Sequence, residues 1–161
     1  VRSILLAEPG NHYLVLTSDG KALRFADDEL RASGRVGQGV QAINLGKGAE
    51  VIVAFTVAEN DSRYLVTAAS SGLGKKTRLE DYPAKGRATG GVQAMGLGVT
   101  DALVAAALVD EDDDLLIWTE KDEPPLRVLA KDIPTTARDR KGSLLPSLVK
   151  GERPAGLVRV D

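Results

Sequence analysis

Lysine and arginine side chains gather beside glycine turns in the middle of the chain, and their chemistry is the binding of anions. Lys75, Lys76, Arg78, Lys85 and Arg87 fall within 13 positions. Cations placed near flexible turns suit contacts with the phosphates of a nucleic-acid backbone, which need no recognition of the bases. The competing interpretation is a solvated loop, which is what most charge clusters are. The residues alone leave both open.

Similar cations recur in the other two thirds of the chain: Lys21, Arg24 and Arg35 before the cluster, and Arg127, Arg138, Arg140 and Lys141 after it. If they hold equivalent places in a repeated fold, they share one rim of the molecule. A structural role is the alternative for Arg35, Arg87 and Arg138, whose guanidinium groups would then bind loop carbonyls or an upstream acidic residue such as Glu29.

The composition excludes several other kinds of site. The chain has no cysteine and a single histidine, His12, so disulfides, thiol nucleophiles and zinc–thiolate sites are absent. The acidic run Asp110–Asp114 lacks the glycine and glutamate of a calcium-binding EF-hand loop and is interpreted as a loop, with the further hypothesis that it repels DNA. We predict no catalytic residue, no metal and no cofactor.

The length of the chain predicts a single domain, and its composition predicts a buried core. The 161 residues are 43% hydrophobic and 27% charged, which suffices for a buried core. Lys and Arg number 21 against 23 Asp and Glu, so a basic surface must be segregated on one face. No apolar run approaches the roughly 18 residues of a membrane span. We expect a cytoplasmic fragment of a longer chain.

An internal repeat organises the whole sequence. Residues 34–42 (GRVGQGVQA) recur 52 positions later as residues 86–94 (GRATGGVQA), and a weaker third copy follows. Each unit ends in an aliphatic run. The repeat predicts units at residues 7–57, 58–109 and 110–161, with residues 1–6 as the last strand of a preceding unit.

Within a unit the pattern is that of four short strands. In the first unit, residues 13–17 and 22–25 flank the turn Ser18–Lys21, residues 40–45 suggest a third strand, and Val51–Val57 is the fourth. Four strands per repeat are typical of propeller blades, which cover one another's faces. We predict an all-β fold of about three four-stranded blades.

The sequence of the second unit resembles a known family. Residues 72–83 (GLGKKTRLEDYP), followed by 86–92 (GRATGGV), resemble the blade repeat in the C-terminal domain of DNA gyrase A and of its topoisomerase IV counterpart. The resemblance implies a six-bladed β-pinwheel of which this chain is a part. Neighbouring blades of a pinwheel exchange a strand, and a basic outer rim binds and bends duplex DNA. It also implies a second partner, the catalytic core of a bacterial type IIA topoisomerase, and a place beside the chromosome in the cytoplasm.

On that basis the predicted DNA contacts are Lys21, Arg24, Arg35, Lys75, Lys76, Arg78, Lys85, Arg87, Arg138, Arg140 and Lys141. The rival hypothesis is a propeller scaffold that binds protein and touches DNA little. Neither residues 33–39 nor residues 85–91 fully match the Gln-Arg-Arg-Gly-Gly-Lys-Gly box usual in gyrase. Either the box lies in a blade outside this chain or the parent is of the topoisomerase IV type.

Overall fold

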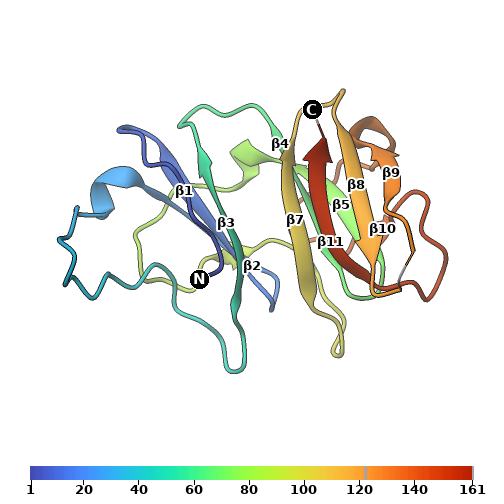
Figure 1. Ribbon diagram of the computed structural model, residues 1–161, viewed down its shortest axis with the longest axis horizontal. Coiled ribbons are helices and arrows are strands. Elements are labelled where there is room, and N and C mark those ends of the chain that lie inside the picture. Colours follow the sequence, from blue (N-terminus) through green and yellow to red (C-terminus); the bar gives the residue numbers. More distant parts are fainter. Residues whose placement is uncertain (122, 161) are drawn as a thin grey trace.

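The structure, a computed structural model, describes residues 1–121 and 123–160 and consists of three antiparallel sheets. Each sheet is one blade (Figure 1). Blade 1 has the order β3 (Val51–Val57), β1 (His12–Thr17), β2 (Lys21–Ala26), β6 (Val92–Gln93). Blade 2 has the order β7 (Leu103–Val109), β4 (Tyr64–Ala69), β5 (Leu73–Arg78), β10 (Ser143–Leu144). Blade 3 has the order β11 (Pro154–Val160), β8 (Asp114–Thr119), β9 (Leu126–Leu129).

Strand exchange joins the blades. The short strand β6 belongs to the second repeat in sequence yet pairs with β2 of blade 1, and β10 of the third repeat pairs with β5 of blade 2. The all-β pinwheel is confirmed. The expected third strand at residues 40–45 of the first repeat is wrong, because only an isolated bridge from Ile43 to Thr89 is described there.

Blades 1 and 2 are covered on both faces, which explains why most of their strand residues are apolar, whereas Trp118, Val158 and Val160 on the outer face of blade 3 are exposed. Successive residues of a strand point to opposite faces, and in β4 Leu65 enters the core between blades 1 and 2, whereas Val66 enters the core between blades 2 and 3. On the outer face of blade 1, the rings of Tyr13 and Phe25 pack 5.7 Å apart. The aliphatic composition therefore follows from blades stacked face to face.

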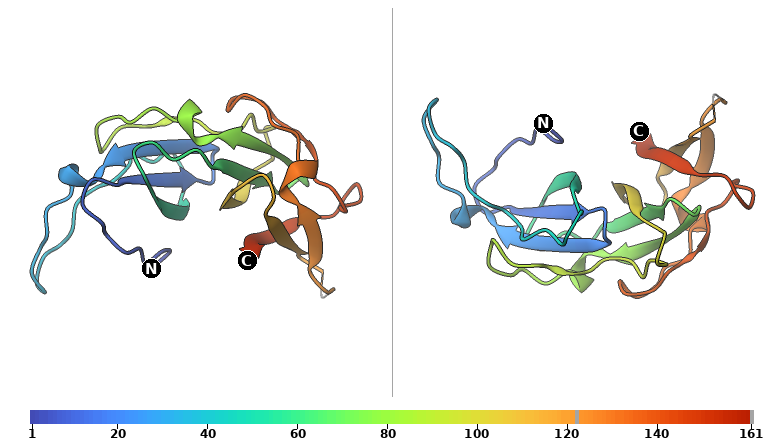
Figure 2. Two further views of the ribbon diagram at one scale, coloured as in Figure 1. Left: turned by 90° about the horizontal axis from the view of Figure 1, so that it is seen from above. Right: turned by 90° about the horizontal axis from the view of Figure 1, so that it is seen from below.

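The three blades follow an arc, seen from above and below in Figure 2. The inner strands β3, β7 and β11 and both marked ends of the chain lie on the concave side, and the segments that lead to β6 and β10 run along the convex side. Residues 1–6 form no strand; they lie beside β3, where Ser3 Oγ accepts a hydrogen bond from Ala54 N (3.2 Å). Because exchange builds the sheets of blades 1 and 2 from two repeats each, the unit boundaries at residues 57 and 109 stay a prediction. In the described part of the chain, none of the helices has the length and apolar character needed to cross a membrane.

Strand pairing fixes which residues are equivalent in the three hairpins. Opposite the strand residues Leu14, Val66 and Leu116 lie Arg24, Lys76 and Arg127, respectively. These three cations therefore hold one place in three successive blades. The same register makes His12 equivalent to Tyr64.

Replacement of Gly91 by alanine is expected to lower the free energy of unfolding by about 2 kcal/mol. Gly91 has a φ of 70°, and an added Cβ would overlap the carbonyl group of Ala22 on the strand that receives β6. Urea unfolding checks this. Gly90→Ala is the matched control, since nothing lies within 4 Å of a Cβ there; equal losses in the two variants would contradict the argument.

Candidate nucleic-acid interface

Three equivalent segments carry most of the candidate cations, and we call them the outer loops: residues 31–39, 83–91 and 134–142. Each follows a short 3-10 turn, namely Asp27–Glu29, Leu79–Asp81 or Ala130–Asp132. The first two loops hold two cations each and no acid, and the third holds three cations and Asp139. In a chain of net charge −2, these loops are local concentrations of positive charge.

The second and third outer loops lie along the outer edge of the blade before them. Lys85 N donates to Arg24 O (2.8 Å) beside β2, and Lys76 N donates to Pro134 O (3.0 Å) beside β5. Main-chain hydrogen bonds thus hold these loops against the sheets, on the convex side of the arc in Figure 2. The fold presents their exposed side chains outward on rigid supports.

The exposed members of the predicted contact set are found mainly on these loops. Arg35, Lys85, Arg140 and Lys141 are exposed. Exposed Arg31 was missed by the sequence analysis. The 52-residue repeat aligns it with Pro83, at the start of the second outer loop, so its place in the first outer loop was visible in the sequence. Outside the loops, Lys21 is half-buried at the start of β2. Arg78, at the end of β5, lies over the ring of Tyr64, 5.3 Å from its centroid.

Three of the predicted contacts are buried side chains. Arg24, Lys75 and Lys76 retain 6%, 0% and 1% of their accessible surface, so they are not free to reach a phosphate. Their physical role is to bind backbone carbonyl groups of the following blade. A buried charge needs such partners, because its desolvation is otherwise costly.

Arg24 joins blade 1 to the linker and 3-10 turn of the next blade. Its Nη2 donates to Ala58 O (2.9 Å) and Glu59 O (2.6 Å), and its Nη1 donates to Leu79 O (3.4 Å). Its Nε donates to His12 Nδ1 (3.0 Å), which gives the single histidine a structural role. Burial lowers the pKa of Arg24, yet arginine keeps its charge in proteins.

Lys76 repeats this arrangement one blade later. Its Nζ donates to Ala130 O (3.0 Å), the counterpart of Leu79 O, and to Glu111 Oε1 (2.8 Å). The hydrogen bond from Lys76 lowers the pKa of Glu111. The ammonium group also lies 4.8 Å from the centroid of the Tyr64 ring. We call Arg24 and Lys76 the interblade clamps.

Lys75 holds the third outer loop from beneath. Its Nζ donates to Thr77 Oγ1 (2.8 Å), Arg138 O (2.9 Å) and Ala137 O (3.2 Å). Burial lowers the pKa of Lys75 to about 8. Lys75 therefore supports the loop whose surface side chains face outward.

The lowered pKa of Lys75 predicts a pH dependence of stability. Between pH 8 and the ordinary value of 10.5 the unfolded chain binds more protons at this residue than the folded chain, so this group makes the free energy of unfolding rise with pH. The contribution is about 3 kcal/mol across that window. Urea unfolding of wild type and Lys75→Met at several pH values isolates it, because Tyr82 and other groups titrate in both proteins. Parallel pH curves would contradict the prediction.

The guanidinium groups of Arg87 and Arg138 bind backbone carbonyls, as the structural alternative for these residues predicts. Arg138 Nη1 donates to Gln93 O (3.0 Å), and Arg87 Nη1 donates to the equivalent Gln41 O. The main-chain N of Arg87 also donates to Glu29 Oε2 (2.7 Å). Both arginines are half-buried, so they connect neighbouring loops and expose only part of their charge.

Most of the acidic run is already paired with cations. Glu111 binds Lys76, Asp113 lies 3.6 Å from Arg159, and Asp114 is ion-paired with Arg127. Its effect on DNA stays a prediction. Among the described residues, no group of three or more His, Cys, Asp or Glu side chains is placed to hold a metal ion.

The sequence model of one family, described as "DNA gyrase C-terminal domain, beta-propeller", matches residues 11–59 and 63–110, more than half of the chain. The chain belongs to this family. Similar proteins include the DNA gyrase A proteins of Deinococcus deserti, 38% identical over 138 residues, and of Escherichia coli, 32% identical over 147 residues. These matches cover 82% and 91% of this chain but 17% of each relative.

Solved structures share the gyrase C-terminal fold. The C-terminal domain of DNA topoisomerase IV superposes with a TM-score of 0.87 at 22% identity, covering 99% of this chain and 49% of that one. The DNA gyrase A C-terminal domain gives 0.84 at 20% identity, covering 96% and 52%. This chain thus spans about half of each solved domain and a small part of the full-length gyrase A relatives.

Proposed function

We propose that this chain binds duplex DNA by its phosphate backbone along the outer loops and bends it around the convex side. Membership of the gyrase C-terminal domain family supports the type of ligand. The observation that carries the proposal is the concentration of exposed positive charge on three equivalent loops of a chain whose overall charge is negative.

The residues proposed to contact DNA are those cations of the outer loops whose side chains are exposed. Arg31 and Arg35 serve the first loop, Lys85 the second, and Arg140 and Lys141 the third. Lys21, Arg87 and Arg138 are half-buried, and Arg78 is exposed but lies over the Tyr64 ring, so these four contribute less. Arg24, Lys75 and Lys76 act only through the fold.

The shape of the arc suits a curved duplex. Bending a short stretch of DNA costs on the order of 1–6 kcal/mol, which several phosphate contacts along a convex surface offset. Such contacts are indifferent to base sequence, and their strength comes largely from counterion release. The excess of acid elsewhere repels the backbone from other surfaces and favours the outer loops.

In the cell this activity serves a larger enzyme. We propose that the catalytic core of a type IIA topoisomerase is the second partner, to which the bent DNA is presented. The setting is the bacterial cytoplasm, beside the chromosome.

Anisotropy titrations of a fluorescent duplex of about 40 base pairs at several salt concentrations test the proposal. Four to five phosphate contacts predict a slope of about −4 in log affinity against log salt, the same for unrelated sequences. Absence of binding at low salt, by protein shown to be folded, would refute it and favour the scaffold hypothesis.

A further inference from the structure

The single histidine of the chain orients the buried arginine that joins blades 1 and 2. Arg24 carries its N–H donors in one rigid plane. Its Nε donates to His12 Nδ1 (3.0 Å) within blade 1, and its two Nη atoms reach carbonyls of the following repeat, those of Ala58, Glu59 and Leu79. Because the guanidinium plane is rigid, the hydrogen bond at Nε fixes the direction of the other donors.

The same place in blade 2 holds a different ring and a different cation. Tyr64 is equivalent to His12, and its ring centroid lies 4.8 Å from Lys76 Nζ. An ammonium group turns its three donors about a single bond, so Lys76 needs no neighbour to orient it. Tyrosine side chains are also uncharged at neutral and mildly acidic pH. The junction of blades 1 and 2 therefore differs from the next junction in its dependence on a histidine.

Protonation of His12 would remove the acceptor that Arg24 Nε uses. An imidazolium carries a proton on both nitrogens, and arginine keeps its charge, so two N–H groups would face each other. Histidine is the side chain whose charge ordinarily changes between about pH 5 and pH 8. Carboxylates are ordinarily ionised in that range and attract an imidazolium, which favours protonation within the folded chain. The charged groups on the elements around His12 are Glu8, Asp27, Asp28, Glu59, Asp61, Arg63, Glu80 and Asp81.

The angle between blades 1 and 2 also determines how far apart two outer loops lie. The second outer loop is held on blade 1, where Lys85 N donates to Arg24 O (2.8 Å). The third is held on blade 2, where Lys76 N donates to Pro134 O (3.0 Å). Exposed Lys85 therefore moves with blade 1, and exposed Arg140 moves with blade 2.

We propose that His12 is a positioning residue for the bending of DNA and makes that bending dependent on pH. Neutral His12 orients Arg24, Arg24 holds the angle between blades 1 and 2, and that angle sets the curve along which the outer loops bind phosphates. Protonation in mild acid loosens the junction, so the bound duplex bends less. The last step, to DNA, rests on the proposed function, whereas the effect on the blades does not.

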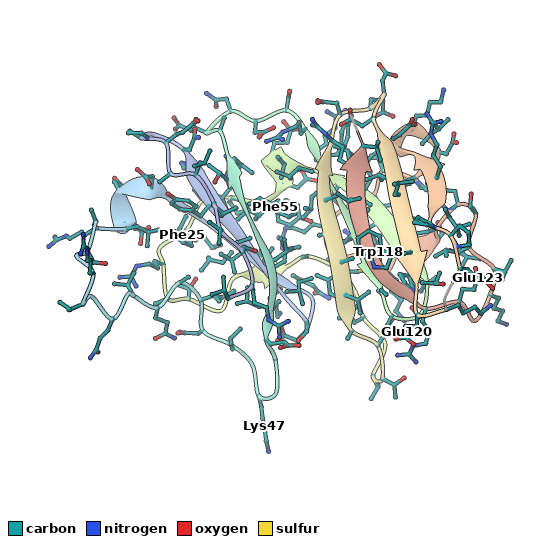
Figure 3. The ribbon with its side chains drawn as sticks, in the orientation of Figure 1. Phe25, Lys47, Phe55, Trp118, Glu120 and Glu123 are labelled. Carbon is teal, nitrogen blue, oxygen red and sulfur yellow. The ribbon has the colours of Figure 1, made fainter. Side chains whose placement is uncertain are left out.

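Distances between spin labels test the effect on the blades in the absence of DNA. Because the chain has no cysteine, Lys47→Cys with Val99→Cys places one label on an exposed turn of blade 1, labelled in Figure 3, and one on the equivalent turn of blade 2. From about pH 7.5 to about pH 5.5 this distance distribution is expected to broaden by at least about half. Val99→Cys with Lys150→Cys, across blades 2 and 3, should give one distribution at both pH values.

Two variants of His12 separate protonation from a merely structural role. In His12→Asn an amide oxygen takes the place of Nδ1 as the acceptor and gains no proton in mild acid. Its label distances should match those of the wild type at neutral pH and stay the same on acidification. In His12→Ala the acceptor is missing, so the broad distribution should be present at both pH values.

Energy transfer between dyes at the two ends of a duplex of about 20 base pairs tests the effect on DNA. With the wild-type chain in mild acid, the transfer efficiency should return at least about halfway to that of the free duplex, and with His12→Asn it should keep its neutral-pH value. Affinity should change by at most about twofold, because no phosphate contact is removed.

Three results would overturn the inference: wild-type label distances that ignore pH, an equal response in His12→Asn, or a duplex whose bend stays constant while the label distances broaden. Failure of the proposed function would look different. No duplex would then bind at either pH, which would refute the step to DNA, while a response of the labels that His12→Asn abolishes would support the role of His12 in positioning the blades.

Discussion

Replacing Arg24 by methionine is expected to lower the free energy of unfolding by about 3 kcal/mol. Methionine keeps an apolar stem of similar length but leaves the buried carbonyls of Ala58, Glu59 and Leu79 without their donor. Unsatisfied buried acceptors are costly, and here they lie at the junction of two blades. Urea unfolding measures the loss, and DNA affinity per folded molecule should stay within about twofold, since Arg24 is buried.

Arg127→Met is the matched control, because Arg127 holds the equivalent place in blade 3 but is exposed and paired with Asp114. A surface ion pair contributes at most about 1 kcal/mol, so the control should be nearly as stable as the wild type. An Arg24 variant that keeps its stability and loses DNA binding would return Arg24 to the interface and contradict its assignment as a clamp.

Reversing three charges on the outer loops is expected to have the largest effect on binding. Lys85→Glu, Arg140→Glu and Lys141→Glu together should weaken duplex binding by about 100-fold at low salt and reduce the salt slope by about 3. All three side chains are exposed, so the fold should tolerate the changes. Titration of a labelled duplex at several salt concentrations gives both numbers.

The control for this variant reverses three charges away from the outer loops: Lys47→Glu, Lys121→Glu and Arg153→Glu. Lys47 projects from the turn before β3 (Figure 3), and the side chains of Lys121 and Arg153 are 56% and 59% exposed. The change in net charge is the same, so only the position differs. Equal weakening by both triple variants would mean that total charge, and not the outer loops, governs binding.

Much of the fold was predictable because repetition magnifies weak signals. The glycine-rich segments at residues 34–42 and 86–94 and the aliphatic runs recur at nearly constant spacing, which defines blades even where single strands are short. The exchanged strand was harder to place. Residues 40–41 repeat Val92–Gln93 in sequence. Such a segment forms a strand only where it can pair with the edge strand of a neighbouring blade, as Val92–Gln93 does with β2.

The candidate site was predicted less well, for a physical reason. Lysine and arginine are rarely buried, so Arg24, Lys75 and Lys76 were assigned to the surface. Their acceptors are main-chain carbonyls, which every residue carries and no sequence pattern marks. A signal was nevertheless present, since Arg24 lies between Leu23 and Phe25 in the middle of a strand. The exposed cations were assigned correctly to glycine-rich loops, and their contact with DNA stays a prediction.

Lysine footprinting of the folded chain, with and without a duplex, tests the central claim most directly. Acetylation detected by mass spectrometry should be suppressed by DNA at Lys85 and Lys141 and unchanged at exposed Lys47, while buried Lys75 and Lys76 react slowly in both samples. Protection at Lys47 with none at Lys85 and Lys141 would place DNA elsewhere and contradict the account.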